Sequence, residues 1–421
     1  MKSITLKHQL LRNPFLIFLP FLMYYVFYVI RHHTDAMIGD ESRYYQYAQN
    51  LLQGFYASQS DDMYLWNGPG YPVFLMPFVY FKMPLLFITL TNAVLQYLSI
   101  VYLFKSIKLL SNNKSALIFS LFWAIAFGAY SHMQSIITES LSYLLVALLS
   151  YFIILSFQKR RKINMLFAGF LLGYLALTKI IFGYIVAILF IINLFIWLIK
   201  KQNKNYRTGI FISTIALLTI VPYLLYTQSL TGKFFYLGNS GGLSLYWMST
   251  PYENEYGDWN NINFIAGNPA LSKPDHQAKL SVHHQKEMNE ILQFKKVERD
   301  EAFKKAAIKN IKTHPKKYLK NIVYNISRMF FNTPNSYSYK SITKLIWHSG
   351  ILIFLILAGI FFSVANRKKI DYSIVFLVTI AGLFIGATSL LSADYRLFSP
   401  IIPLLLVWIA YAFKKRFEVG Q

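Results

Sequence analysis

The sequence has no cysteine and very few acidic residues. Of its 421 residues only 18 are Asp or Glu, and charged residues of both signs make up 14%. An average globular chain has about 25% charged residues. The lack of cysteine excludes structural disulfides, thiolate metal sites and cysteine nucleophiles. The scarcity of charge argues against an ordinary soluble protein.

Apolar and basic residues are abundant instead. Hydrophobic residues reach 55%, with 36 Phe and 31 Tyr, and 42 Lys and Arg give a formal net charge of +24. A nucleic-acid binder would explain the basicity but not the apolar fraction, and the aromatic content excludes a disordered chain. A polytopic membrane protein explains both, because Lys and Arg collect in cytoplasmic turns between apolar spans. We therefore expect the lipid bilayer as a partner and no nucleic acid.

Long apolar runs predict an all-α membrane protein with about ten transmembrane helices, in a range of about 8 to 13. The 163–199 stretch is either a tight hairpin or a span with a broken helix. The expected spans lie near residues 14–30, 85–104, 115–130, 137–157, 163–178, 180–199, 208–227, 342–363, 372–391 and 397–413.

The basic residues predict the orientation. When the chain is threaded alternately through the membrane, six segments on one side hold 20 of the 42 Lys and Arg. The three short turns on the other side hold only Lys179 and Arg396. The positive-inside rule then places both termini in the cytoplasm of a plasma (inner) membrane protein. We expect the first helix to be an uncleaved signal anchor, because no small-residue cleavage site follows it.

Two long segments fall on the extracytoplasmic side. The first is a loop over residues 31–84, within an N-terminal transmembrane region of residues 1–227. The second, residues 228–341, is expected to form an extracytoplasmic loop or domain before the C-terminal transmembrane helices of residues 342–421. This second segment holds 16 basic and 9 acidic residues, which does not contradict the orientation, because long loops translocate regardless of charge.

The first loop contains the only acidic stretch of the chain. Outside the large loop there are nine acids, and five of them lie between residues 35 and 62. The run from Asp40 to Gly54 predicts a helix, with Asp40 as N-cap and Gly54 as the stop. Its apolar stripe suits a membrane interface, which would put Asp40 at the membrane surface. The alternative is that Asp40 and Glu41 merely cap this helix. The stripe consists of Tyr44, Tyr47, Ala48, Leu51 and Leu52.

An apolar run rich in proline and glycine follows over residues 67–78. Four of the five residues from Gly68 to Pro72 are Gly or Pro, so the run is not expected to begin as a plain helix. It is either a rigid turn that returns the loop to the membrane or, with Tyr71, one wall of a substrate groove.

These features together resemble the GT-C class of membrane glycosyltransferases. The resemblance is closest to the branch of protein O-mannosyltransferases and lipid A aminoarabinose transferases. It rests on Asp40-Glu41-Ser42-Arg43-Tyr44 after the first helix and on the Pro-Gly-Tyr-Pro run of residues 69–72. Further pieces follow in the family's order, namely Thr138-Glu139-Ser140-Leu141, residues 168–179, Pro222-Tyr223, residues 313–319 and Asp394-Tyr395-Arg396.

The resemblance implies transfer of a sugar from a polyprenyl-phosphate donor to an extracytoplasmic acceptor, which is a glycan, a lipid or a protein hydroxyl. It implies that Asp40 is the catalytic base of an inverting displacement, with Glu41, Arg43 and Tyr44 as neighbours in the motif. The aminoarabinose transferases carry Glu-Lys-Pro at the re-entry point, where this sequence has Trp66-Asn67-Gly68-Pro69 and no cation. This departure argues against lipid A as the acceptor and against the metal site of that subgroup.

Such a reaction needs a base and cations for the leaving phosphate, all at the outer membrane surface. Asp40 meets the first need. Arg396, Arg43 and Lys179 are the candidates for the second, although a cation at a helix end can also simply snorkel. Glu139 lies at the start of an expected span, where a charged residue is costly and therefore indicates a specific role. It either pairs with a cation or positions the acceptor.

The large loop predicts a pair of helices and a weak histidine cluster. One helix carries Phe303 and Ala307 on its apolar stripe, and the next begins at Pro315 and lies on the membrane. His276, His283 and His284 lack a carboxylate at fixed spacing, so they do not support a metal site. On this basis the sequence assigns no cofactor, and a divalent metal stays open as an alternative that no ligand set supports.

Three other function classes compete with the transferase. A transporter or flippase of lipid-linked sugars predicts internal repeats and ionisable residues at mid-bilayer, and neither is seen. A polymerase or ligase of surface polysaccharide generally lacks the Asp-Glu motif directly after the first helix. A non-catalytic relative that only binds lipid-linked sugar is disfavoured by the intact Asp40.

Overall fold

The computed structural model describes residues 13–57, 65–125, 127–200, 203–260, 274–331, 351–365 and 370–419. Within these ranges every regular element is helical, as the sequence predicted. Six helices are long and apolar enough to cross a membrane, and four shorter ones are also apolar. The chain is therefore a multi-pass membrane protein, while the expected count of about ten spans stays a prediction. The long helices are Leu85–Leu110, Glu139–Lys159, Ile181–Ile199, Lys204–Thr231, Tyr372–Ser389 and Tyr395–Lys414.

The N-terminal third contributes the elements that surround the first loop. The helices α2 (Pro14–Ile17) and α3 (Leu19–Arg31) precede it, and α4 (Asp40–Leu52) and α5 (Gly70–Tyr80) lie within it. Two of the five clustered acids, Asp61 and Asp62, fall outside the described residues.

A bundle of seven helices follows α5 and packs through neighbouring pairs. In α10, Gly169 and Gly173 are four residues apart, and a Cβ at Gly169 would lie 2.5 Å from the Cβ of Ile215 on α12. Small residues at this spacing let two membrane helices approach closely. The helices are α6 (Leu85–Leu110), α7 (Asn113–Ala124), α8 (Phe127–Met133), α9 (Glu139–Lys159), α10 (Lys162–Thr178), α11 (Ile181–Ile199) and α12 (Lys204–Thr231).

The expected span near residues 115–130 is wrong as a continuous helix. The chain forms α7, which ends at Ala124, and the short α8. The carbonyl oxygen of Ala124 accepts hydrogen bonds from the hydroxyls of Tyr25 (2.6 Å) and Tyr130 (3.1 Å). Because these two hydroxyls satisfy the carbonyl, the chain can break there inside an apolar environment.

Two expectations about the first loop also need correction. The N-cap of α4 is Gly39 (φ 63°) rather than Asp40, which is the first residue of the helix. The Pro-Gly run is not only a turn, because α5 begins inside it at Gly70 and has Pro69 as its N-cap. Pro72 lies in the first turn, where a missing N–H costs no hydrogen bond.

The described parts of residues 241–331 form four helices, and the first three of them share a hydrophobic core of their own. The helices are α13 (Gly241–Met248), α14 (Pro274–Leu292), α15 (Lys296–Thr313) and α16 (Pro315–Phe331). The expected helical pair is thus confirmed as α15 and α16. Tyr246, Trp247 and Phe303 are buried in this second core, separate from that of the bundle. We call these helices the α13–α16 cluster.

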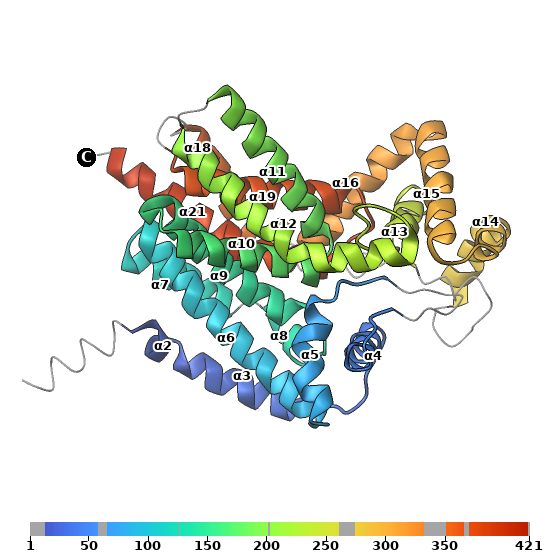
Figure 1. Ribbon diagram of the computed structural model, residues 1–421, viewed down its shortest axis with the longest axis horizontal. Coiled ribbons are helices and arrows are strands. Elements are labelled where there is room, and N and C mark those ends of the chain that lie inside the picture. The colour runs from blue at the N-terminus through green and yellow to red at the C-terminus, as the bar shows by residue number, and fades with distance from the viewer. Residues whose placement is uncertain are drawn as a thin grey trace, which may run out of the picture.

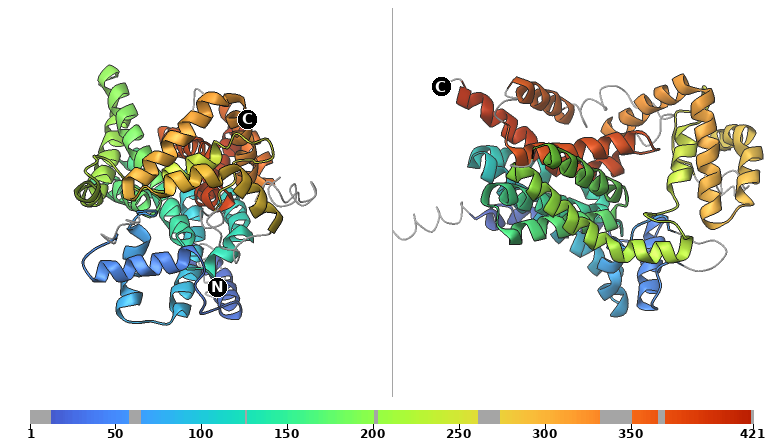
Figure 2. Two further views of the ribbon diagram at one scale, coloured as in Figure 1. Left: turned by 90° about the vertical axis from the view of Figure 1, so that its right-hand side faces the viewer. Right: turned by 45° about the horizontal axis from the view of Figure 1, so that its top comes forward.

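The C-terminal helices return to the bundle. They are α18 (Ile351–Ala365), α19 (Tyr372–Ser389), α20 (Tyr395–Phe398), the 3-10 helix η5 (Ser399–Ile401) and α21 (Ile402–Val419). Residues 342–350 of the expected span at 342–363 lie outside the described residues. The α13–α16 cluster stands at one end of the molecule, opposite the end of α21 (Figure 1), and the right-hand view of Figure 2 shows the same separation.

Candidate active site

The guanidinium of Arg396 bridges two carboxylates that come from distant parts of the chain. Its Nη1 lies 2.6 Å from Oδ2 of Asp40, and its Nε lies 2.8 Å from Oε1 of Glu139. Asp40 opens α4, Glu139 opens α9 and Arg396 lies on α20. Three of the residues that the sequence singled out therefore meet at one point.

Lys179 also reaches this point. Its Nζ donates to the same Oε1 of Glu139 at 3.0 Å. Glu139 is the first residue of α9 and Lys179 is the C-cap of α10. Each charge is favoured by the dipole of its own helix, because acids stabilise N-termini and cations stabilise C-termini.

Arg43 occupies the other side of Asp40. Its Nη2 pairs with Oδ1 of Asp40 one turn earlier on α4, and its Nε donates to Oδ1 of Asn67 at 2.8 Å. Asn67 in turn donates to the hydroxyl of Tyr44 at 2.9 Å. The guanidinium also lies 5.3 Å from the ring centroid of Trp66, a cation–π distance. Each oxygen of Asp40 is thus engaged by a guanidinium.

The five charged side chains form one network that runs from a buried end to a partly exposed end. The side chain of Glu139 is 0% exposed and that of Lys179 is 8% exposed, whereas those of Asp40 and Arg396 are each 31% exposed. With Arg43, three cations face two carboxylates, so the network carries an excess of one positive charge at neutral pH. Such a site attracts an anion.

Two polar atoms, one in the network and one in the neighbouring residue Tyr71, are buried without a hydrogen-bond partner. They are Oε2 of Glu139 and the hydroxyl of Tyr71. The ring of Tyr71 packs edge-on against that of Tyr44, with 5.2 Å between centroids. Burial also raises the pKa of the Tyr44 hydroxyl above its ordinary value. A buried polar atom without a partner is rare and needs an explanation, such as a bound ligand.

Glu41 points away from this network. Its Oε2 accepts from the amide of Ile38 and its Oε1 from the amide of Ile136, both at 2.8 Å. Both carboxylate oxygens are therefore used to join the start of α4 to the segment between α8 and α9. This arrangement favours a positioning role over a catalytic one.

Hydrogen bonds at both of its ends hold α20, the helix that carries Arg396. Oδ1 of Asp394 caps it by accepting from the amide of Leu397 at 3.3 Å. The hydroxyl of Ser399 donates to the carbonyl of Arg396 at 3.2 Å and also contacts the hydroxyl of Tyr143 at 2.8 Å. Tyr143 continues to Nδ1 of His132 at 2.6 Å.

Glycine at positions 68 and 70 lets the first loop press against the end of α10. A Cβ at Gly68 would lie 2.0 Å from the carbonyl oxygen of Leu177, and one at Gly70 would lie 2.5 Å from Oγ1 of Thr178. The hydroxyl of Tyr174 donates to the carbonyl of Gly70 at 2.8 Å. This close contact brings the backbone of the loop against the residues on either side of Lys179, from Leu177 to Ile180.

Sequence reasoning missed four residues of this region: Asn67, His132, Tyr143 and Ser399. Asn67 lies in the stretch that was noted for its prolines and glycines and for its lack of a cation, although its own side chain bridges Arg43 and Tyr44. The other three are polar residues inside apolar runs, and that was the signal available for them.

The residues of the network do not fit a divalent metal. Its two carboxylates already pair with three side-chain cations, and a metal ion would add to an excess of positive charge. In the ranges that the structure describes, no group of three or more His, Asp or Glu is placed to hold a metal ion.

His283 and His284 take part in a separate hydrogen-bonded cluster, and the side chain of His276 lies outside the described residues. Glu255 contacts Nδ1 of His283 at 2.7 Å and Nε2 of His284 at 2.8 Å, and Thr250 donates to the same carboxylate. Burial alone would raise the pKa of Glu255, but the hydrogen bonds of His284, Thr250 and His283 outweigh it and hold this pKa below its ordinary value. The cluster therefore joins the segment after α13 to α14.

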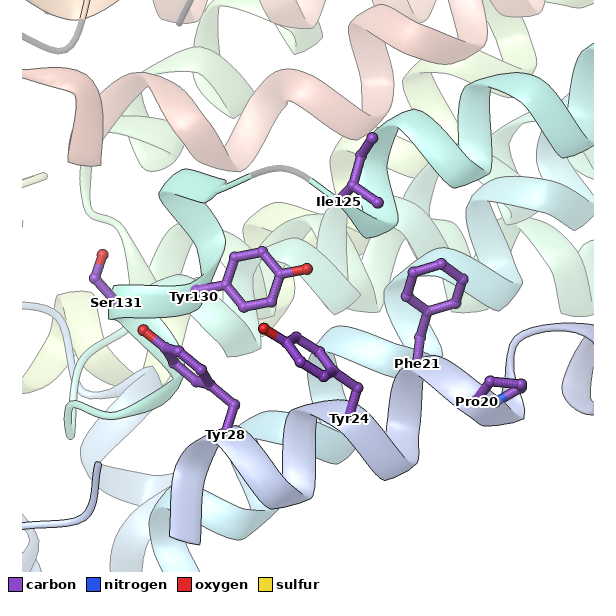
Figure 3. Close-up of a pocket in the computed structure, with 7 residues that line it drawn as sticks. All are labelled: Pro20, Phe21, Tyr24, Tyr28, Ile125, Tyr130 and Ser131. Atoms are coloured by element: carbon purple, nitrogen blue, oxygen red, sulfur yellow. The ribbon is translucent and has the colours of Figure 1, made fainter. Parts of the chain in front are cut away.

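An aromatic cavity of about 530 Å³ lies beside the break between α7 and α8 (Figure 3). Tyr130 in its wall contacts both Tyr24 and Tyr28 edge-on, and the rings of Tyr24 and Tyr28 are tilted by 33° to each other. At one end Gln134 donates to the hydroxyl of Tyr28 at 2.5 Å, two residues from Ile136, which binds Glu41. The lining residues are Pro20, Phe21, Tyr24, Tyr28, Ile125, Tyr130 and Ser131.

The sequence matches no protein-family model and no curated protein. Among solved structures, it is similar to the archaeal oligosaccharyltransferase AglB from Archaeoglobus fulgidus in complex with an inhibitory peptide and a dolichol-phosphate. The identity is 13% and the TM-score 0.53, over 96% of this chain and 50% of that one. For the apo form of the Archaeoglobus fulgidus oligosaccharyltransferase, the identity is 13% and the TM-score is 0.53, and the alignment covers 96% of this chain and 51% of that one. The chain thus spans about half the length of these relatives.

A lower similarity connects the chain to ArnT from Cupriavidus metallidurans bound to undecaprenyl phosphate. The identity is 14%, and the alignment covers 95% of this chain and 77% of that one. The TM-score of 0.39 is too low to support an argument, so the branch within the class stays a prediction. The similarity to AglB establishes the fold alone: the chain has the fold of the GT-C class of membrane glycosyltransferases.

Proposed function

We propose that this protein is an integral-membrane glycosyltransferase that moves a sugar from a polyprenyl-phosphate donor to an acceptor hydroxyl at the extracytoplasmic membrane surface. The observation that carries this proposal is the network in which Arg396 bridges Asp40 and Glu139. Its charged groups lie at the ends of α9, α10 and α20 and on the loop helix α4, within a GT-C fold.

The cations are assigned to the phosphate of the donor. Arg396 and Arg43 are the accessible cations at the partly exposed end of the network. Guanidinium groups bind phosphate through paired hydrogen bonds. Lys179 stays paired with buried Glu139 and holds that carboxylate in place for Arg396. A preorganised cation on the leaving phosphate lowers the barrier where charge develops.

Asp40 is assigned as the base. In the arrangement seen, each of its oxygens pairs with a guanidinium, so neither is free to accept a proton. A donor phosphate that takes over part of these contacts releases one oxygen for the acceptor hydroxyl. Binding of the donor would thus release the base for the acceptor.

The proposed reaction is a single displacement at the anomeric carbon. The acceptor oxygen forms the new bond to this carbon while its proton passes to Asp40. The bond from the carbon to the phosphate oxygen breaks, and polyprenyl phosphate leaves with the electron pair. Attack opposite the leaving group inverts the configuration of the sugar.

The two unpartnered atoms of the site are assigned to the substrate. Oε2 of Glu139 accepts hydrogen bonds and the hydroxyl of Tyr71 can donate or accept. A sugar presents hydroxyl or amino groups that match both. A site that leaves these atoms unpaired with the wrong sugar discriminates strongly against it, so Glu139 and Tyr71 are the proposed determinants of sugar choice.

The aromatic cavity is assigned to the polyprenyl chain of the donor. It is lined mainly by apolar and aromatic side chains along α3, and its Tyr28 end adjoins the segment that binds Glu41. A carrier that stays in the bilayer needs an apolar surface leading away from the cations. The volume of about 530 Å³ is in the usual range of ligand pockets.

The proposal keeps the topology expected from the sequence. Both termini are cytoplasmic, residues 31–84 and 228–341 are extracytoplasmic, and the site faces that side. Cysteines introduced singly into this cysteine-free chain and labelled with an impermeant thiol reagent would test this. Labelling of position 35 only after the cells are permeabilised would contradict it.

Activity is tested with purified protein in lipid nanodiscs. A panel of polyprenyl-phosphate sugars is incubated with membrane-extracted glycan, lipid and protein acceptors, and release of polyprenyl phosphate is measured. We expect release with at least one pair and an altered surface glycan or glycoprotein in a deletion strain. If no pair reacts and the deletion strain keeps all its glycans, the proposal fails.

A further inference from the structure

One face of α16 carries a stripe of buried polar side chains. Lys317, Asn321, Asn325 and Arg328 follow one another at intervals of four, four and three residues, and each is no more than 6% exposed. Residues at this spacing share one side of a helix. Buried polar groups need hydrogen-bond partners, and here the partners lie in two different segments of the chain.

The first part of the stripe holds the segment after α13. Nδ2 of Asn321 donates to the carbonyls of Met248 at 3.0 Å and Thr250 at 3.1 Å. Lys317 donates to Oδ1 of Asn321 at 3.0 Å and to the carbonyl of Glu255. These contacts stay within the α13–α16 cluster and the segment that follows α13.

Asn325 instead holds the turn that connects α19 to α20. Its Nδ2 donates to the carbonyls of Thr388 (3.1 Å), Ser389 (3.1 Å) and Leu391 (2.6 Å). Its Oδ1 accepts from the amide of Ala393 at 2.9 Å. One fully buried side chain therefore binds backbone groups on both sides of the turn.

Other residues of the α13–α16 cluster reinforce this contact. Nη2 of Arg328 donates to Oδ1 of Asn325 at 3.0 Å and fixes its orientation. The hydroxyl of Tyr318 donates to the carbonyl of Leu390 at 2.9 Å, and the amide of Ser392 donates to the carbonyl of Ser244 at 3.3 Å. The turn is thus attached to the cluster at several points.

We propose that Asn325 is a positioning residue that sets Arg396 between Asp40 and Glu139. Arg396 follows Ala393, the last residue that Asn325 binds, by three positions, and α20 starts between them. Fixing the turn fixes the base of α20 and hence the direction of its guanidinium. The inference rests on the proposed function, because it gives Arg396 a role in donor binding that Asn325 supports.

Asn321 provides a matched control. It is the same residue type on the same helix one turn earlier, it is equally buried, and it also donates two hydrogen bonds to backbone carbonyls. It does not touch the turn before Arg396. A purely structural role of the stripe predicts similar effects for Asn321→Ala and Asn325→Ala.

The test combines kinetics with a distance measurement that does not depend on activity. We expect Asn325→Ala to lower kcat/KM for the donor by about 10- to 100-fold, since a small misplacement of a catalytic group costs this much. Asn321→Ala should stay within about threefold. In the Arg396→Gln background, Asn325→Ala should lower kcat/KM for the donor by less than about threefold more, because the group that Asn325 positions is already gone. Asn325→Asp, which keeps the acceptor but loses the three donated bonds, serves if Asn325→Ala does not fold.

Spin labels are attached at Leu52 and Leu390, which are both exposed. The distance between the two labels reports the position of the turn relative to α4. Because the chain has no cysteine, introduced cysteines are the sole labelling sites. Asn325→Ala should broaden this distance distribution and Asn321→Ala should not. Equal broadening in both variants, or full additivity with Arg396→Gln, would overturn the inference. An inactive wild type with the expected difference in broadening would instead contradict the proposed function and leave the positioning of the turn in place.

Discussion

Arg396 and Asp40 are 356 residues apart in the sequence, yet Nη1 of Arg396 lies 2.6 Å from Oδ2 of Asp40. This ion pair joins α4, within the first loop, to the start of the candidate spanning helix Tyr395–Lys414. Because Arg396 also binds Glu139, the pair cannot change without disturbing a fully buried carboxylate. The predictions below follow from this arrangement and from the contacts around it.

Asp40→Asn should abolish transfer while leaving the protein folded and inserted. The amide keeps the size of the side chain but cannot take the proton of the acceptor, and loss of a general base typically costs about 10²- to 10⁴-fold in rate. Turnover is measured with the donor and acceptor pair found above. Asp35→Asn is the control, because Asp35 lies in the same loop with its side chain 87% exposed. Wild-type turnover in Asp40→Asn would refute the assigned base.

Arg396→Lys should weaken use of the donor more than use of the acceptor. Lysine keeps the charge but cannot bridge two carboxylates and a phosphate as a planar guanidinium does. We expect KM for the donor to rise about 10- to 100-fold, on the scale of one charge-assisted hydrogen bond. Arg31→Gln, at the exposed end of α3, should have no effect. An unchanged apparent affinity for the polyprenyl donor would argue against a phosphate role.

Transfer should survive removal of divalent metals. The carboxylates that would hold a metal are paired with Arg43, Lys179 and Arg396, so side-chain cations supply the positive charge at the leaving phosphate. Activity is measured after treatment with EDTA and again with added Mg²⁺ or Mn²⁺. Loss of more than about tenfold on chelation, restored by one of these ions, would contradict the assignment of the cations.

Ser131→Trp should select against long carriers. Ser131 lines the aromatic cavity, and an indole there fills space that the polyprenyl chain is proposed to use. We expect KM to rise for a donor with a long polyprenyl chain and to stay unchanged for a donor with two isoprene units. Phe195→Trp, at an exposed position of α11, is the control. Equal effects on both donors would place the chain elsewhere.

Acid should loosen the α13–α16 cluster through Glu255. The folded pKa of Glu255 lies below its ordinary value, so its contribution to stability is present above the ordinary carboxyl pKa of about 4.3. The contribution is lost as the pH falls from there through the folded pKa. Glu255→Gln should lower the thermal stability of the cluster at pH 7 and flatten this acid dependence. Trp247, whose ring centroid is 5.0 Å from that of His284, provides a fluorescence signal for the transition.

The contacts that lie within one helix could be predicted from the sequence. Asp40 and Arg43 are three residues apart on α4, so their pairing follows from the helical repeat. The charge rule also marked Lys179 and Arg396 as cations on the unfavoured side of the membrane. Both residues lie in the network, but the rule does not say what they contact. That both reach Glu139 depends on how α9, α10 and α20 pack.

The break between α7 and α8 and the role of Asn67 could not be predicted in this way. The break depends on hydroxyls of Tyr25 and Tyr130 that meet one carbonyl, and hydropathy does not register single hydrogen bonds. Asn67 acquires its function only because Gly68 and Gly70 let the loop approach α10. For α16, the sequence pattern indicated only the apolar face of the helix. The stripe of buried polar side chains on α16, which is proposed to position the turn before Arg396, was not recognised.

The order of the site residues along the chain has a consequence for synthesis. Asp40 and Glu139 leave the ribosome long before Arg396, so Glu139 enters the membrane before the guanidinium that pairs with it exists. Domains and spans are made from the N-terminus onward, and Lys179, only 40 residues after Glu139, is the first partner to arrive. The network of Asp40, Glu139 and Arg396 is therefore completed only when α20 has been made, so under the proposed function a nascent chain that ends before α20 does not bind the donor phosphate as the complete network would.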